Sequence, residues 1–190
     1  MMHEHGVVDS ILEGVSLNKE VELSRDHCVN LALICSNDDK SGHDLSKLLS
    51  ERLRLSKDES TSVSFLHDCR GLDLDHSVGS VRRFRAALPK FRQNRALDYL
   101  SGLGRDTSHF ERVLRDLRVL GAGNSPLVDG HTLSRATGLN PGRRLGRLKG
   151  WLHWIQIEED ISDVDEVLSR LAPLEWEDSD PELWPRLSWP

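Results

Sequence analysis

A basic segment in the C-terminal half carries the side chains with the clearest chemistry in this sequence. Arg143, Arg144, Arg147 and Lys149 follow one another closely, and Trp154 comes five residues later. A guanidinium can form paired hydrogen bonds with a phosphate, and an indole can stack on a base. On a helix, Arg143, Arg147 and Trp154 share one face, while another face carries Leu145, Leu148, Leu152 and Ile155. The pattern predicts an amphipathic helix with RNA-binding side chains on its exposed face.

The tryptophans and glycines of this segment also have a purely structural interpretation. Trp151 and Trp154 can pack against the tryptophans of the C-terminal tail, which are Trp176, Trp184 and Trp189. Glycines recur every four residues at 142, 146 and 150, so they form a stripe on one side of a helix. We expect this stripe to allow close packing of a neighbouring helix.

Charge is strongly partitioned along the chain, although the total is only −6. Residues 82–149 carry 15 Lys/Arg against 5 Asp/Glu, a net of +10. Residues 1–79 carry 8 against 15, a net of −7, and residues 151–190 carry 2 against 11, a net of −9. Clustered cations favour a localised phosphate contact, because neutralising phosphates releases counterions. The alternative is that the acidic tail folds over the basic middle.

Three further residues complete the candidate RNA-binding set. Arg112 and Arg115 lie on an expected helix of the basic region, and His131 begins a short helix after a turn. His131 can contact a phosphate or a 2′-hydroxyl, or it can simply cap or pack locally. The candidate RNA-binding residues are therefore Arg112, Arg115, His131, Arg143, Arg144, Arg147, Lys149 and Trp154.

Catalytic and metal-binding patterns are weak in comparison. His43-Asp44 and His67-Asp68 each match the histidine-aspartate motif of metal-dependent phosphohydrolases, but that chemistry requires further ligands on neighbouring helices. Asp73 and Asp75 lack the strand that two-metal catalysis requires. The three cysteines show no metal-ligand spacing, and Cys28 and Cys35 are expected on one buried helix face, with a redox or metal role as the alternative. We therefore expect no catalytic and no metal-ligating residues.

Residues 125–149 read as a turn, a short helix, a stop and a second helix. Asp129-Gly130 is typical of a turn, His131–Thr137 is a short helical run, and Gly138 is suited to end it in the left-handed conformation. Asn140 is expected to cap the next helix, with Pro141 at its first position.

The order of these residues resembles the C-terminal part of the class II CCA-adding tRNA nucleotidyltransferase and poly(A) polymerase family. The resemblance is strongest over 125–173 and looser over 25–124, where the histidine-aspartate pair of some members is missing near Cys35-Ser36. The residues that carry it are Leu127, Asp129, Gly130, Leu133, Gly138, Leu139, Pro141, Gly142, Gly146 and Leu148.

The resemblance implies a tRNA-binding role in CCA addition, the processing of tRNA 3′ ends, with helices that grip the backbone of the acceptor and T-arm. The family's catalytic head, with its Gly-Ser loop and paired aspartates, is missing, so the chain is expected to be inactive alone. Mg²⁺ and CTP or ATP would belong to that head, which a separate subunit would supply, and this chain would need no cofactor. The alternatives are a degenerate histidine-aspartate phosphohydrolase and a helical protein-interaction module.

The expected fold is all-α, because alternating β-branched patterns are nearly absent and apolar residues recur at helical spacing. Expected helices include 19–35, 44–55 and 56–68, the last with a capping box formed by Ser56 and Glu59. We expect an acidic neck-like segment at 1–79, a basic RNA-binding body and tail at 80–173, and an acidic Trp/Pro-rich tail at 174–190. No run is long enough to span a membrane and no secretory signal is recognisable, so a cytoplasmic location without membrane contact is expected.

Overall fold

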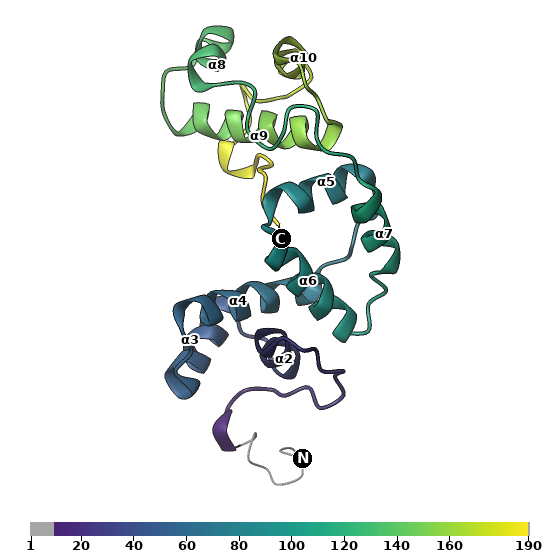
Figure 1. Cartoon of the computed structure of the whole chain (residues 1–190). Coiled ribbons are helices and arrows are strands. Elements are labelled where there is room, and N and C mark those ends of the chain that lie inside the picture. The colour runs from purple at the N-terminus through teal and green to yellow at the C-terminus, as the bar shows by residue number, and fades with distance from the viewer. Residues whose placement is uncertain (1–9, 190) are drawn as a thin grey trace. The chain divides into compact units, whose positions relative to one another are not determined.

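The computed structural model describes residues 10–189, which form helices joined by loops (Figure 1). No strand occurs among these residues, which confirms the expected all-α fold class. The α-helices are α2 (His27–Ile34), α3 (Gly42–Leu53), α4 (Lys57–Asp68), α5 (Val78–Ala87), α6 (Lys90–Gly102), α7 (Ser108–Asp116), α8 (Gly130–Thr137), α9 (Arg143–Glu159) and α10 (Val164–Ser169), and the short 3₁₀ helices are η2 (Cys69–Gly71) and η3 (Pro181–Leu183). None of the described helices combines the length and the apolar character needed to cross a bilayer.

The described chain divides into two compact units. Unit 1 contains residues 10–74 and 90–108, and unit 2 contains residues 75–89 and 109–189. This partition differs from the expected boundary at residue 79, because α5 belongs to unit 2 and α6 belongs to unit 1. The tail after residue 173, expected to be a separate segment, lies within unit 2.

Unit 1 is organised by helices whose first turns are capped by side chains. The Asp26 carboxylate accepts hydrogen bonds from the first turn of α2, and Ser41 caps α3. Ser56 and Glu59 form the expected capping box at the start of α4, which confirms that prediction. The buried core of this unit includes Leu33, Leu45, Leu49, Leu66, Tyr99 and Leu100.

Close packing between α3 and α4 depends on the absence of a side chain at Gly42. A Cβ atom there would lie 2.2 Å from the carbonyl oxygen of Ser64 and 2.6 Å from a carboxylate oxygen of Asp68. The Asp68 carboxylate also accepts a 2.8 Å hydrogen bond from the Gly42 N–H. The α3 N-terminus is therefore held against α4 by backbone contact.

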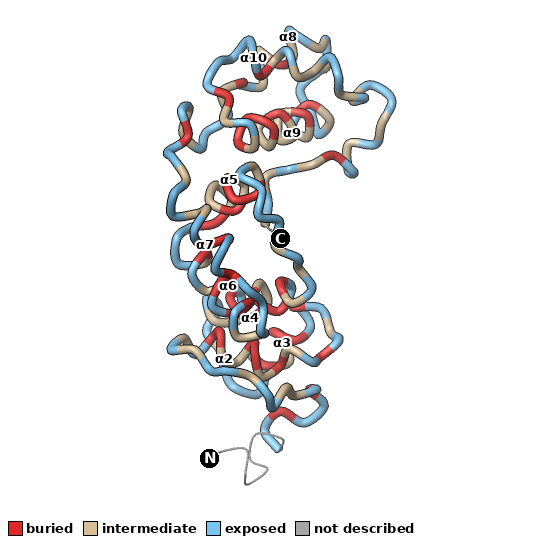
Figure 2. The backbone as a smooth tube through the Cα atoms, turned by 90° about the vertical axis from the view of Figure 1, so that its right-hand side faces the viewer, coloured by how far each residue is buried: buried red, intermediate tan, exposed pale blue. Residues whose placement is uncertain are grey.

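Unit 2 surrounds the apolar face of α9. Leu145, Leu148, Leu152 and Ile155 are all buried, as the helical pattern predicts. Figure 2 shows buried stretches along α9 in red. The four apolar residues pack with residues from α8, α10, the loops before these two helices and the tail, namely Leu133, Val167, Val128, Ile161 and Trp184. Asp129 caps α8, and Gly138 ends it with φ +73°, which confirms the expected turn, helix and stop.

Three expected details of the helices are wrong. The helix expected from residue 19 begins only at His27, because the Asp26 carboxylate accepts N–H groups there and fixes the start. Asn140 and Pro141 do not begin α9; its N-cap is Gly142, which makes no side-chain cap. The Gly142, Gly146 and Gly150 positions face open space, since a Cβ at each would meet nothing within 4 Å.

Candidate nucleic-acid interface

The C-terminal tail is bound by two of the arginines expected to contact RNA. The Arg147 guanidinium donates hydrogen bonds to the carbonyl oxygens of Pro181 at 2.8 Å, Glu182 at 3.0 Å and Trp184 at 3.0 Å. Arg144 donates to the carbonyl oxygens of Trp176 and Glu177, the latter at 2.6 Å. Both side chains are half-buried, and in the fold of unit 2 these hydrogen bonds engage guanidiniums that were expected to contact RNA.

Trp184 anchors the tail on α9. Its ring is 4% exposed and lies 5.6 Å from the Trp151 ring, between centroids. The Arg144 guanidinium carbon lies 5.4 Å from the centre of the Trp184 ring, a cation–π contact. The indole N–H donates to the Ser179 hydroxyl at 2.8 Å. The structural interpretation of Trp151 and the tail tryptophans is thus confirmed for Trp184.

The tail meets these arginines mainly through neutral carbonyl groups. The ion pair in this region joins Arg143 and Glu182 at 2.9 Å, and the Arg143 side chain is 80% exposed. The covering segment, residues 175–182, also carries five carboxylates, so the acidic tail lies over the start of α9, which is the alternative expected from the charge distribution. An exposed ion pair of this kind contributes little to stability and exchanges readily with other anions.

Trp154 lies further along α9, toward its C-terminal end, and packs inside unit 2. The Arg83 guanidinium carbon lies 4.9 Å from the centre of its ring, and Arg83 also pairs with Glu158 at 3.8 Å. Trp154 packs against the buried core of this unit. The expected stacking of Trp154 on RNA is therefore replaced by stacking on an arginine of α5.

The α7 region exposes three arginines at regular spacing. Arg112 and Arg115 lie three residues apart on α7, and Arg118 follows shortly after the helix; all three are exposed. Arg112 and Arg115 are neighbours on the surface of α7, because residues three apart share a helix face, whereas Arg118 lies beyond the end of the helix. In residues 10–189 none of the three guanidiniums forms an ion pair or hydrogen bond. Arg118 was missed from the sequence, although its continuation of the three-residue spacing was a usable signal.

A shallow groove with a volume of about 470 Å³ lies beside these arginines. Arg112 and Arg118 line it together with His109, and Val113 and Leu117 contribute apolar surface to its lining. Two carboxylates and further residues complete the lining, which are Asp116, Asp160, Val78 and Arg82. The groove therefore combines cations with apolar surface.

Two arginines of α5 position this region through backbone contacts. Arg85 donates to the carbonyl oxygens of Leu117, at 2.8 Å, and of Arg118. Burial lowers the pKa of the Arg85 guanidinium, while Asp160 opposes that shift. Arg82 donates to the Glu158 carbonyl oxygen at 2.9 Å and pairs with Asp160 at 3.3 Å. The segment after α7 is thereby fixed near the C-terminal end of α9.

The expected RNA-binding residues therefore fall into two groups. Arg112 and Arg115 belong to the α7 region, which is held near the C-terminal end of α9. Arg143 lies at the N-terminal end of α9. A helix of 17 residues is about 25 Å long, so these groups do not form one cluster. His131 is exposed on α8, and Lys149 is half-buried on α9.

The residues considered for phosphohydrolase or nucleotidyl-transfer chemistry have structural roles. His67 is fully buried, with Nε2 3.0 Å from the Lys40 carbonyl oxygen, and Asp68 holds Gly42. Asp73 pairs with Arg105 at 2.8 Å, and the Asp75 carboxylate accepts hydrogen bonds from Ser77. These residues do not fit the Mg²⁺-binding pair of a nucleotidyltransferase.

The comparisons with known proteins add no relative. The chain matches no family model, no curated protein and no solved structure.

Proposed function

We propose that unit 2 binds the phosphate backbone of RNA through Arg112, Arg115 and Arg118. The observation that carries this proposal is their exposure without protein partners in the described part of the chain. Most other arginines of the basic segment are engaged by carboxylates, carbonyls or rings, as Arg82, Arg95 and Arg105 illustrate. Exposed guanidiniums without ion-pair partners are suited to phosphate oxygens.

The groove beside these arginines suits the remaining parts of a nucleotide. Val113 and Leu117 offer apolar surface, and His109 offers an exposed ring on which a base can stack. Arg143, His131 and Lys149 would extend the contact toward the start of α9. The resemblance to CCA-adding enzymes makes tRNA, in the cytoplasm, the first RNA to test, with a catalytic head on a separate subunit.

The proposal is tested by titrating labelled tRNA with the full chain at low salt. Replacing Arg112, Arg115 and Arg118 by Ala should weaken binding at least tenfold without altering the circular dichroism spectrum. The matched control replaces Arg25, Lys47 and Lys57, three exposed cations of unit 1, and lowers the net charge by the same amount. Equal affinity of the two triple variants would refute the proposed surface.

The second candidate function is a helical protein-interaction module. It is favoured by the carboxylates in the groove, Asp116 and Asp160, and by Val119, which is 87% exposed. Carboxylates repel phosphates, and a valine side chain cannot pair with them. A protein partner can form ion pairs with the carboxylates and pack against Val119. Failure of the parent chain to bind any RNA at low salt would favour this second candidate.

A further inference from the structure

A carboxylate without a partner lines the groove beside α7. Asp116 is exposed, and within residues 10–189 its carboxylate forms no ion pair or hydrogen bond. The second carboxylate of the groove is already engaged, because Asp160 pairs with Arg82 at 3.3 Å and accepts a 3.0 Å hydrogen bond from the Gly121 N–H. Asp116 is therefore the acidic side chain of the lining that is open to a ligand.

The local structure gives Asp116 no stabilising role. It is the last residue of α7, where the helix dipole disfavours a negative charge. Arg112 lies one turn earlier, but in the described part of the chain the two side chains form no ion pair. An acidic residue at this position is accounted for better by binding than by folding.

The residues of α7 that line the groove share one face of the helix. The spacing i, i+3, i+4 and i+7 places on this face His109, Arg112, Val113 and Asp116. The face thus presents an imidazole ring, a guanidinium, an apolar side chain and a carboxylate. These groups can stack on a base, hold its phosphate and accept hydrogen bonds from its edge.

The His109 ring is supported by a second ring. His76 lies beside it, with 5.1 Å between the two ring centroids, and the His76 ring meets the Phe110 ring edge-on at 6.1 Å. Phe110 is 1% exposed, so these rings are anchored in the core of unit 2. An imidazole held in this way offers a defined surface on which a base can stack.

The groove also has the size and the apolar surface that a single base requires. Val78 of α5 is 48% exposed and lines it together with Val113 and Leu117. Its volume of about 470 Å³ lies within the range of about 300–1,000 Å³ that is typical of sites for small ligands. The groove therefore has room for one nucleotide.

We propose that this groove binds an unpaired guanine of RNA, and that the Asp116 carboxylate accepts hydrogen bonds from N1–H and the 2-amino group of the base. This inference rests on the RNA-binding function proposed above and names the base that the site selects. Guanine is the one RNA base with two adjacent donors on its Watson–Crick edge, and a carboxylate offers two acceptor oxygens in one plane. In a duplex these donors face cytosine, so the base must be unpaired. Asp116 would weaken a site that held phosphates alone, whereas the edge of guanine gives its charge a favourable partner.

Two single-stranded RNAs that differ by one base test this proposal. One is an oligouridine of 11 nucleotides, and the other carries guanosine at its central position. Titrated with the full chain at low salt, the guanosine RNA should bind at least about fivefold more tightly, the lower end of what a bidentate contact to a base discriminates. Asp116→Asn should make the two affinities equal, because the amide has one acceptor oxygen and presents a donor in place of the other. Asp165→Asn, which removes the same charge from an exposed position of α10, is the control and should keep the preference.

Inosine at the central position checks the second hydrogen bond without a change in the protein. It lacks the 2-amino group of guanosine, so the inosine RNA should bind more weakly than the guanosine RNA. The guanine site would be overturned, with the RNA surface left in place, if the parent bound the uridine and guanosine RNAs equally, if it bound the inosine and guanosine RNAs equally, or if the preference persisted in Asp116→Asn. A parent chain that binds none of these RNAs would refute the RNA surface and the guanine site together.

Discussion

The Arg147 guanidinium donates a 3.0 Å hydrogen bond to the backbone carbonyl oxygen of Trp184, 37 residues further along the chain. Together with two more carbonyl contacts, it binds the tail to the helix expected to grip RNA. Two arginines of α9, Arg144 and Arg147, therefore stabilise the fold of unit 2. The RNA surface is accordingly assigned to the α7 region.

Replacing Arg144 and Arg147 by Ala should destabilise unit 2 more than it affects RNA binding. A hydrogen bond that involves a charged group contributes about 1.5–3 kcal/mol to stability. Removing both guanidiniums should therefore lower the free energy of unfolding. We expect a lower urea midpoint, and a loss of tRNA affinity that is smaller than that of the α7 triple variant, because charges more than a Debye length from the α7 contact are largely screened. A folded double variant that loses tRNA binding as completely as the α7 variant would contradict this assignment.

Two glycine substitutions should change stability in opposite directions. Gly42→Ala places a Cβ 2.2 Å from a backbone oxygen and should cost about 1–3 kcal/mol. Gly146→Ala lies in the exposed interior of α9 with open space around it, and should stabilise by about 0.5–1 kcal/mol. Urea denaturation of the two variants measures both effects, and changes of the same sign would show that the packing described for one glycine is wrong.

Unit 1 should lose stability below neutral pH because His67 is buried as a neutral ring. Burial and then Arg70 lower its pKa, while Asp38 and Asp68 oppose the shift, and Nδ1 has no partner among the described residues. The imidazole therefore binds a proton more readily in the unfolded chain than in the folded chain. The contribution of His67 to stability is fully present above about pH 6.5, and it declines as the pH falls toward the pKa of His67 in the folded chain.

Urea midpoints between pH 5 and 7 measure this contribution of His67. His67→Gln keeps a donor for the Lys40 carbonyl oxygen but cannot titrate, so its midpoint should vary less with pH than that of the parent. His131→Gln, at an exposed position, is the matched control and should keep the parent's pH dependence. Identical pH dependence in all three proteins would exclude the proposed role of His67.

Gln156 should prove important for the loop before α8. Its Oε1 accepts from the Leu127 N–H at 2.9 Å, and its Nε2 donates to the Ser125 carbonyl oxygen at 3.0 Å. Gln156→Leu keeps the volume but leaves two backbone groups unpaired, at a cost of about 1–3 kcal/mol for each one left buried. The free energy of unfolding from urea titration checks this value. An unchanged value would mean that water replaces the amide.

The sequence predicted those features that depend on local chemistry. The capping box at Ser56, the left-handed stop at Gly138 and the buried face of α9 all follow from rules that act within a few residues. Features that depend on distant contacts were not predictable in the same way. The carbonyl groups that bind Arg147 belong to a segment more than 30 residues away, and backbone acceptors leave no signature in a sequence.

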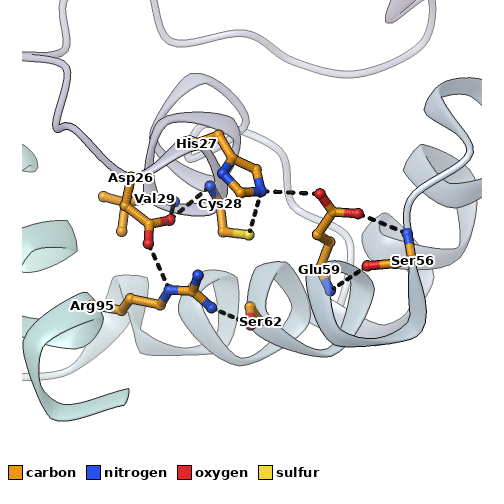
Figure 3. A network of polar contacts seen from close by, with 8 residues as sticks. All are labelled: Asp26, His27, Cys28, Val29, Ser56, Glu59, Ser62 and Arg95. Atoms are coloured by element: carbon orange, nitrogen blue, oxygen red, sulfur yellow. Dashed lines mark hydrogen bonds and ion pairs between the residues drawn. The ribbon is translucent and has the colours of Figure 1, made fainter. Parts of the chain in front are cut away.

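The candidate sites show the same division between local and distant contacts. The exposed spacing of Arg112 and Arg115 could be read from the sequence, but their freedom from partners could not. The contact between His27 and Glu59 joins α2 and α4 across 32 residues, so local chemistry could not predict it (Figure 3). The open space beside Gly146 likewise depends on which helices pack elsewhere.

The salt dependence of tRNA binding tests the central claim most directly. If Arg112, Arg115 and Arg118 each neutralise a phosphate, replacing all three by Ala should make the slope of log K against log [salt] shallower by about 2 to 3. The unit 1 triple variant Arg25→Ala, Lys47→Ala and Lys57→Ala should keep the parent slope. A slope that is unchanged in the α7 variant, or that falls equally in both, would contradict RNA binding by these arginines.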